Sequence, residues 1–452
     1  MADDQSGDPA ETPVAPTLFP LPPPTPPAAR PTPADPQPGA RVRSAQRGQI
    51  AWGRIDLEAT LPADHPARAI WAVVERLDLA ALYAQIAARD EVAGAPAIDP
   101  KLLLALWVYA TSEGEGSARE LGRLTRCHDA YRWLCGGVEV GYHTLSDFRS
   151  QQGAVLDGLI TQVLALLLQQ ELVDLHRVAQ DGTRVRASAG ASSFRRTQTL
   201  EALMAEARAH LETVTREAAD PALSARRAAA RQRGAADRLA RLEAALQQVP
   251  AVTVTKQRSG AKDATVRVST TDPEARVMKM GDGGFRPAFN VQFATTADAA
   301  RVIAGVAVTT RGSDMGETTP MLEQIETRTG VRPAEILVDG GYPQHAAIDQ
   351  AAARGATVYA PVPKPRKGDL RDPHAPRATD SAAVAAWRER MATDEAKAIY
   401  PQRAATAETV NADAKAHRGL DHLAVRGRDK VLGSVCLFAL TYNILRLITL
   451  RG

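Results

Sequence analysis

Apolar residues recur at spacings of three and four positions from about residue 65 to residue 170, which is the period of amphipathic α-helices. The segments "PARAIWAVVERLDLAALYAQI" and "DPKLLLALWVYATSEG" show this period most clearly. Asp99 is a suitable N-cap for the second segment, and Pro100 suits its first helical position. The pattern predicts a compact domain of short helices. Such domains serve many purposes, so this part alone indicates no function.

Near residue 175 the pattern changes to short apolar runs, which are typical of β-strands. "LHRVAQDGTRVRASAG" predicts a strand that ends at Asp181, before a glycine. "FNVQFATTADAARVIAGVAVTT" predicts an antiparallel hairpin, because apolar residues alternate with Asn290 and Gln292. "EILVDGGYPQ" predicts a buried strand that ends at Asp339, and a helix and the strand "ATVYAPVP" follow. Carboxylates at strand ends lie at the edge of a sheet, where α/β folds bring catalytic groups together.

Residues 197–248 are rich in Ala, Arg, Glu and Leu and predict a helical hairpin inserted in the sheet region, at residues 195–250. The predicted order is a strand with Asp181, the insertion, an antiparallel hairpin, a strand with Asp339, a helix, a strand and C-terminal helices. This order predicts an α/β fold with a ribonuclease-H-like mixed sheet, plus an all-helical N-terminal domain. We expect a disordered Pro-rich tail at 1–44, the helical domain at 45–170 and the sheet domain at 171–452.

Composition changes this picture little. Residues 1–40 hold 13 of the 30 prolines, which predicts a disordered or polyproline-like tail. The net charge of +3 gives no overall field that requires a nucleic-acid partner. Only 9 of the 55 basic residues are Lys, a bias that we attribute to a G+C-rich genome. The basic stretch 41–54 is therefore either a DNA-contacting arm or a solvated linker.

The three cysteines are Cys127, Cys135 and Cys436, and no two form a CxxC pair. This sparse, odd count fits a reducing cytoplasm and argues against a disulfide framework. Cys127 and Cys135 could form a zinc site with His128 and His143, but the spacing matches no common zinc pattern. Buried or surface residues are the favoured interpretation.

Two further segments have alternative interpretations. "GDGGFRPAFN" has the glycines of a phosphate-binding loop but lacks the P-loop Lys-Ser/Thr, so we expect a turn before a strand. Residues 431–450 are long enough to span a bilayer. Asn443 and Arg446 would be costly inside lipid, so a buried packing helix is favoured and no membrane partner is expected. The acidic N-terminus has no apolar segment typical of a signal peptide.

Two carboxylates at neighbouring strand ends, Asp181 and Asp339, repel each other unless cations are present. Two Mg²⁺ ions roughly 3.5–4 Å apart remove this repulsion and activate the attacking and leaving oxygens of phosphoryl transfer. Mg²⁺ prefers oxygen ligands and keeps several waters, so two or three carboxylates suffice. A third acid is therefore expected on a helix that reaches the same edge.

The segment "YPQRAATAETVNADAK" supplies a candidate for this third acid. Glu408 and Lys415 are seven residues apart, so they share one face of a helix, and Tyr400 and Arg403 lie just before them. A carboxylate for metal, with Arg and Lys nearby to hold phosphate oxygens, suits phosphodiester chemistry. The alternative is an exposed helix with ordinary charges.

Several stretches together resemble the DDE transposases of bacterial insertion sequences, in the InsH-like group with a helical N-terminal domain. They are "PKLLLALWVYATSEGEGSARELGRLTRCHDAYRWLCGG", "YHTLSDFR", "AQDGTRVRASAG", "DPEARVMKMGDGGFRPAFNVQ", "LVDGGY", the Tyr-Arg-Glu-Lys segment and "LAVRGRDKVLGSVCLFALTYNILRL". Each is weak alone, whereas their order and spacing are specific. The resemblance spans about residues 45–450.

The resemblance implies that Asp181, Asp339 and Glu408 are catalytic and bind two Mg²⁺ ions, for which Mn²⁺ can substitute. It implies cleavage and strand transfer of double-stranded DNA, at the element's ends and at a target. The helical domain would read the ends, and the protein would form a homodimer on DNA, in the cytoplasm at the nucleoid. The residues expected near DNA are Tyr400, Arg403, Lys415, Arg426 and Arg428.

One spacing departs from the family pattern. Four residues separate Arg403 from Glu408, where the commonly written signature has three. Glu395 is the alternative third acid, although the spacing to Lys415 fits Glu408 and does not fit Glu395. Lys430, with Lys364, Arg366, Lys367 and Arg371 of a basic loop, could also line a DNA path or be merely solvated.

Two rival functions stay open at this point. One is a catalytically inactive transposase descendant that still binds DNA. The other is a ribonuclease-H-like nuclease without strand transfer, which would cleave with metal and give no joined products. Terminal inverted repeats beside the gene would favour a mobile element.

Overall fold

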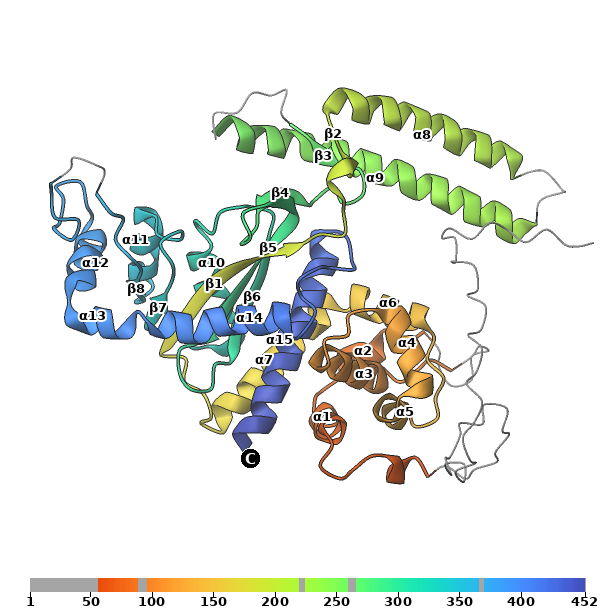
Figure 1. Cartoon of the computed structure of the whole chain (residues 1–452), viewed down its shortest axis with the longest axis horizontal. Helices are drawn as coiled ribbons and strands as arrows, with labels where there is room; N and C mark the ends of the chain where they lie inside the picture. Colours follow the sequence, from red (N-terminus) through yellow and green to blue (C-terminus); the bar gives the residue numbers. More distant parts are fainter. Residues whose placement is uncertain (1–55, 88–95, 219–223, 259–265, 366–369, 452) are drawn as a thin grey trace, which may run out of the picture. The chain divides into compact units, whose positions relative to one another are not determined.

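The computed structural model describes residues 56–87, 96–218, 224–258, 266–365 and 370–451. All of them fall in the compact unit Ile55–Gly452. The expected Pro-rich tail, the basic stretch 41–54 and the basic residues Arg366 and Lys367 lie outside the described residues. The described part of the unit begins with helices and continues with an α/β part (Figure 1).

The described chain before residue 170 is helical, as its apolar spacing predicts. Asp99 caps α3 as predicted: its side chain accepts a hydrogen bond from the Lys101 N–H at 2.8 Å, and Pro100 takes the first position. Nearly all of α3 is buried, against α1, α5, α6 and α15, which explains why its sequence is apolar on all sides. The elements are η1 (Glu58–Thr60), α1 (Pro66–Val74), α2 (Ala80–Ala84), α3 (Pro100–Ser112), α4 (Ala118–Cys127), α5 (Asp129–Cys135), α6 (Tyr142–Gln151) and α7 (Gly153–Gln169).

A mixed sheet forms the centre of the second part. Within the described ranges its strand order is β4-β5-β1-β7-β8, and β6 also pairs with β5. β1 is antiparallel to β5 and parallel to β7, which is in turn parallel to β8. The predicted hairpin around Asn290 is confirmed, because β5 and β6 pair antiparallel. The strands are β1 (Arg177–Arg186), β4 (Arg276–Lys279), β5 (Phe285–Thr296), β6 (Ile303–Thr309), β7 (Glu335–Leu337) and β8 (Thr357–Tyr359).

Asp181 lies inside β1, so the prediction that the strand ends there was wrong. Gly182 continues the strand and is paired with Gln292 of β5. A Cβ atom on Gly182 would lie 2.2 Å from Gln292 Nε2 and 2.3 Å from Asp314 Oδ1. Glycine is needed here because buried polar side chains fill the space of a Cβ, and not because the backbone turns.

We expect Gly182→Ala to lower the free energy of unfolding by about 1–3 kcal/mol, the usual cost of overpacking a core. The two atoms that the new methyl group meets, on Gln292 and Asp314, are held by hydrogen bonds and cannot move away freely. Urea denaturation measures the change. Gly158→Ala is the matched control, because Gly158 is exposed in α7 with nothing within 4 Å of its Cβ position. It should leave stability unchanged or raise it, and equal stability of both variants would contradict the account.

Helices cover both faces of the sheet. The ring of Phe438 in α15 lies 5.4 Å from that of Phe293, so α15 packs on the Phe293 face. Gly305 of β6 is paired with Ala294, which faces the opposite side, and there Met321 of α10 fills the space above the glycine. The remaining elements are α10 (Thr318–Thr329), α11 (His345–Ala353), α12 (Ala382–Ala392), α13 (Asp394–Ile399), the π-helical turn η4 (Ala404–Glu408), α14 (Thr409–Ala416) and α15 (Arg428–Arg451).

α15 is long and apolar enough to span a bilayer, yet most of it is buried inside the protein. It packs against α7, α3 and β6. Asn443 accepts a hydrogen bond from the Ile303 N–H at 2.9 Å and donates to the Ile303 carbonyl at 2.8 Å. The polar residue that is costly in lipid therefore has a specific partner in the sheet, as the packing-helix interpretation requires.

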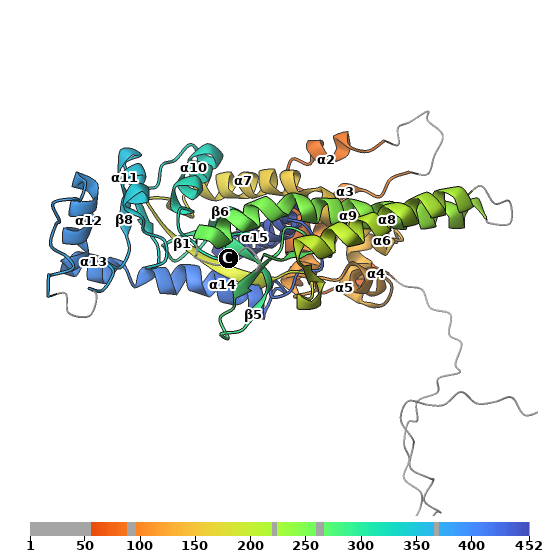
Figure 2. The same ribbon diagram turned by 90° about the horizontal axis from the view of Figure 1, so that it is seen from above.

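The insertion between β1 and β4 is a pair of long helices, α8 (Thr197–Glu217) and α9 (Ala225–Arg258), which lie side by side in both views (Figures 1 and 2). Ion pairs between Arg208 and Glu243 and between Arg231 and Glu217 show that they run antiparallel. The helices share an apolar core of their own. The short strands β2 (Phe194–Arg195) and β3 (Val268–Ser269) pair beside them, with η2 (Ala191–Ser193) just before.

Candidate active site

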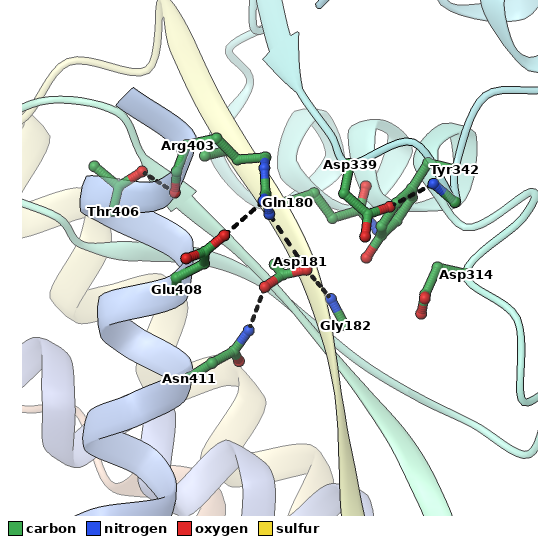
Figure 3. A network of polar contacts seen from close by, with 12 residues as sticks. Gln180, Asp181, Gly182, Asp314, Asp339, Tyr342, Arg403, Thr406, Glu408 and Asn411 are labelled. Atoms are coloured by element: carbon green, nitrogen blue, oxygen red, sulfur yellow. Dashed lines mark hydrogen bonds and ion pairs between the residues drawn. The ribbon is translucent and has the colours of Figure 1, made fainter. Parts of the chain in front are cut away.

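Asp181 lies in β1, and Asp339 lies two residues past the end of the parallel strand β7, at the equivalent position along the strand direction. Ala179 of β1 is paired with Leu337 of β7, and each aspartate lies two residues further along its own strand direction. Glu408 comes from η4, which packs against β1 and β5. The three acids are distant in sequence, and Figure 3 shows them approaching one another from these three elements.

A tight turn holds Asp339. Its Oδ1 accepts a hydrogen bond from the Gly341 N–H at 2.7 Å, and its carbonyl accepts one from the Tyr342 N–H at 3.2 Å. A Cβ atom on Gly341 would lie only 3.0 Å from Asp339 Oδ1. Glycine after the strand therefore lets the carboxylate fold over the turn, which is the role of an Asx turn.

The Asp181 carboxylate is largely buried and has three partners. Asn411 Nδ2 donates to its Oδ2 at 2.9 Å, the Gly182 N–H donates to its Oδ1 at 3.0 Å, and Arg403 Nη1 lies 3.6 Å from Oδ1. Burial raises the pKa of Asp181 to about 6 against the opposing effects of Arg403 and Asn411, and the nearby charge of Asp339 raises it further. A cation bound beside this buried carboxylate would stabilise its ionised form, which burial disfavours.

This pKa makes a prediction for the metal-free protein. The folded state keeps the Asp181 proton up to about pH 6, whereas the unfolded chain loses it near 3.8, so stability falls as the pH rises between these values. The whole difference corresponds to roughly 3 kcal/mol. The Asp181→Asn variant has no side chain at this position that can titrate. The unfolding free energy of this variant minus that of wild type should therefore increase from pH 4 to pH 6. Urea denaturation in EDTA measures this difference in unfolding free energy, and a difference that does not change with pH would contradict the assigned pKa.

Arg403 joins Glu408 to Asp181. Its Nη2 donates to Glu408 Oε1 at 2.6 Å, while Nη1 faces Asp181. Residues five apart lie on different faces of a regular α-helix, but η4 is π-helical, and a π-helical turn closes between residues five apart. The extra residue between Arg403 and Glu408 is thus absorbed in the π-turn. Glu395 is exposed in the first turn of α13, and no contact joins it to the two aspartates in the described residues, so the geometry favours Glu408.

Arg403 stands where a metal ion would neutralise the acids. In the part of the chain that the structure describes, no three His, Cys, Asp or Glu side chains lie close enough to share one ion. The Arg403 guanidinium instead bridges Asp181 and Glu408, with only 14% of its side chain exposed. Oxygen donors of one charge, already gathered around a cation, have the chemistry that a divalent ion requires.

The zinc alternative at Cys127 and Cys135 gains no support, because in the described residues these side chains do not gather with His128 and His143 into a metal-binding group. Cys127 is exposed and accepts a hydrogen bond from Arg123. Cys135 is buried, and burial raises the pKa of its thiol to about 11, which disfavours the thiolate that zinc binds.

Besides Arg403, two of the expected DNA-contacting residues lie beside the acids. The Tyr400 ring is 6.0 Å from the Arg403 guanidinium. Lys415 has no hydrogen bond or ion pair with the described residues, and burial lowers its pKa, with Asp421 and Asp181 as nearby opposing charges. A half-buried ammonium without a direct partner, close to the acids, is available to a phosphate.

Arg426 and Arg428 are not brought to the acids. Arg426 Nε donates to the carbonyl of Ser188 at 3.2 Å, and the Arg428 N–H donates to Glu274 Oε2 at 2.8 Å. Both contacts lie beside the start and the end of the helical insertion. These two residues stay candidates for a DNA path outside the acid site.

Sequence reasoning missed the side chains that lie beside Asp181 and its neighbour Gly182. Asn411 lies three residues after Glu408 on one helix face, a spacing that offers a signal for a second polar group at the site. Gln292 and Asp314 give no such signal, because they approach β1 only through strand pairing and a loop.

Comparison with known families adds two findings. Residues 373–448 match the family described as "Transposase DDE domain", a range that contains Arg403, Glu408 and Lys415. Residues 55–151 match the family described as "Transposase domain (DUF772)". No curated protein and no solved structure matches the chain. Neither matched range contains Asp181 or Asp339, so their place beside Glu408 rests on the geometry above.

Proposed function

This chain belongs to the DDE transposases of insertion sequences, and we propose that it cuts phosphodiester bonds at the ends of a DNA element and joins the freed 3′-OH to target DNA. Its narrower placement in the InsH-like group stays a prediction. The mixed sheet with β1 at its centre serves, in this proposal, as a ribonuclease-H-like catalytic core, to which the helical hairpin is an insertion.

One observation supports the proposal most strongly. Asp181 comes from a central strand, Asp339 from the turn after its parallel neighbour, and Glu408 from a π-turn more than sixty residues later. Arg403 bridges Asp181 and Glu408, and the charge of Asp339 lies near enough to Asp181 to raise its pKa. Packing alone does not explain this grouping, since keeping the Asp181 carboxylate and the Arg403 guanidinium largely buried costs free energy. Phosphoryl transfer explains the grouping, because it needs closely placed charges of both signs.

The roles of the chain's own groups follow from their positions. Asp181, Asp339 and Glu408 would hold two Mg²⁺ ions, with Mn²⁺ able to substitute, and such ions activate the attacking oxygen and stabilise the leaving oxygen. Asn411 orients the Asp181 carboxylate through its 2.9 Å hydrogen bond. The cationic side chains of Arg403 and Lys415, together with Tyr400, hold DNA phosphate oxygens.

The helical domain of residues 45–170 would read the element's ends, which gives the two matched ranges separate tasks. Arg426 and Arg428 would extend the DNA path. Two ends must be brought together before joining, so we propose a homodimer on double-stranded DNA, in the cytoplasm at the nucleoid.

The test is a cleavage and joining assay. The purified full chain is incubated with Mg²⁺, a DNA fragment carrying the sequences that flank its gene, and a target plasmid, with EDTA as the control. The proposal predicts Mg²⁺-dependent 3′-OH ends and fragments joined to the plasmid. Cutting without joining would instead indicate a nuclease, and binding without cutting would indicate a catalytically inactive descendant.

A further inference from the structure

A buried polar cluster lies on the other side of β1 from the acids. Its members are Asn290 and Gln292 of β5, Asp314 from the loop after β6, and Tyr342, three residues after Asp339. Asn290, Gln292 and Tyr342 are fully buried, and Asp314 is 7% exposed. We call these four residues the Asp314 cluster.

Gln292 is the centre of this cluster. Its Nε2 donates to Asp314 Oδ1 at 2.7 Å and to Asn290 Oδ1 at 3.2 Å, and its Oε1 accepts a hydrogen bond from the Tyr342 hydroxyl. Asn290 Nδ2 donates to the same Asp314 oxygen at 2.7 Å. The second Asp314 oxygen accepts from Arg184 Nη2 at 2.9 Å. Burial raises the pKa of Tyr342, so its hydroxyl stays protonated and donates.

The cluster connects the strand that carries Asp181 with the turn that holds Asp339. Gln292 is paired with Gly182, the residue after Asp181, and the absent Cβ of this glycine leaves room for the Gln292 and Asp314 side chains. Tyr342 closes the turn that begins at Asp339. Gln180, the residue before Asp181 in β1, also donates to Gln292 Oε1 at 3.2 Å. Hydrogen bonds through Gln292 and Tyr342 therefore connect the strand of Asp181 to the turn of Asp339.

A stable sheet does not need these polar groups. Apolar side chains of similar size would pack in this place with no desolvation cost, whereas a hydrogen-bonded polar network fixes one geometry. Fixed geometry matters at a metal site, where residues behind the ligands set their orientation. The position of the cluster, between the supports of both aspartates, matches that role.

We propose that Asp314 is a positioning residue, which through Gln292 and Tyr342 holds the Asp339 turn at a fixed separation from Asp181. The inference rests on the proposed function, because it concerns the same two aspartates. It also assigns a role to the "FNVQ" stretch, which the sequence alone showed only as part of a strand.

Tyr342→Phe tests the inference, because it removes one hydroxyl and keeps the ring packing. Mn²⁺ binding to the DNA-free protein, followed by electron paramagnetic resonance, should weaken by about 10- to 100-fold, as for other groups that orient metal ligands. In the cleavage assay kcat should fall by a similar factor while KM for DNA is unchanged, and high Mn²⁺ should restore part of the rate. Tyr359→Phe is the matched control: Tyr359 is a buried tyrosine of the same sheet, whose hydroxyl donates to Glu335 at 3.3 Å.

Asp314→Asn is the second variant, and it decides the matter if Tyr342→Phe does not fold. It keeps an acceptor for Gln292 and turns an amide toward Arg184, so it should also weaken Mn²⁺ binding. Unchanged Mn²⁺ affinity and kcat in the folded variants, with an active wild type, would overturn the positioning role alone. Equal losses in Tyr359→Phe would also overturn it, because the effect would then be general. A wild type that neither binds Mn²⁺ nor cuts DNA would overturn the proposed function, and this inference with it.

Discussion

Asp339→Asn and Glu408→Gln are each expected to reduce cleavage and joining by about 1000-fold or more while DNA binding is retained. Each change removes one charged ligand of the proposed metal site, and a metal supplies several kcal/mol of transition-state stabilisation, at about 1.4 kcal/mol per tenfold in rate. Neither side chain is needed for the fold, since Asp339 is partly exposed and the Glu408 side chain is 53% exposed. Cleavage rates and DNA gel-shift affinities, measured on the same preparations, separate the two effects.

Glu395→Gln is the matched control for Glu408→Gln. Both replace a glutamate by its amide between residues 394 and 416, but Glu395 makes no contact with the aspartates in the described residues. Glu395→Gln should therefore cleave at the wild-type rate. Activity that is kept in Glu408→Gln and lost in Glu395→Gln would make Glu395 the third acid.

Arg403→Gln is expected to change metal binding and catalysis in opposite directions. The guanidinium lies 2.6 Å from Glu408 and 3.6 Å from Asp181, so it competes with a divalent ion for the same carboxylates. Charges about 4 Å apart near a protein surface interact by about 4 kcal/mol. Removing the charge should tighten Mn²⁺ binding to the DNA-free protein by about tenfold or more. Cleavage should nevertheless fall by about 100-fold, because a phosphate-holding cation is lost.

Calorimetric Mn²⁺ titration and the cleavage assay together test this pair of effects. Arg390→Gln serves as the control, because Arg390 donates to the Val358 carbonyl and lies over the Tyr359 ring without touching the acids. It removes the same charge and should leave both quantities near wild type. Mn²⁺ affinity that is unchanged in Arg403→Gln would show that the guanidinium does not occupy the metal position.

Local patterns predicted the helices well, because helix signals act within a few residues. Asp99 and Pro100 predict the start of α3, and the expected N-cap hydrogen bond is present. The same local reasoning was wrong at Asp181, where a glycine was interpreted as a strand end. The reason for that glycine is tertiary, since it makes room for Gln292 and Asp314 from other strands and loops.

The candidate site was predictable only in part. A carboxylate followed by two glycines after an apolar run marks Asp339, and its turn is present. Four residues separate Arg403 from Glu408, where the family signature has three, because the helix forms a π-turn there. A rule based on residue spacing alone does not predict such a turn. The three-residue spacing from Glu408 to Asn411 offered a signal in the sequence. Asp314 had no such signal, since its hydrogen-bond partners lie on strands that are neighbours only in the folded chain.

The most direct test of the central claim is to locate the metal. Crystals of the wild-type protein with Mn²⁺ and a DNA fragment carrying the element's end would show the ions by anomalous scattering. We expect two peaks roughly 3.5–4 Å apart, held by carboxylate oxygens of Asp181, Asp339 and Glu408. The Arg403 guanidinium would then bind a DNA phosphate. Mn²⁺ bound away from these three carboxylates, with the DNA end at that other place, would contradict the account.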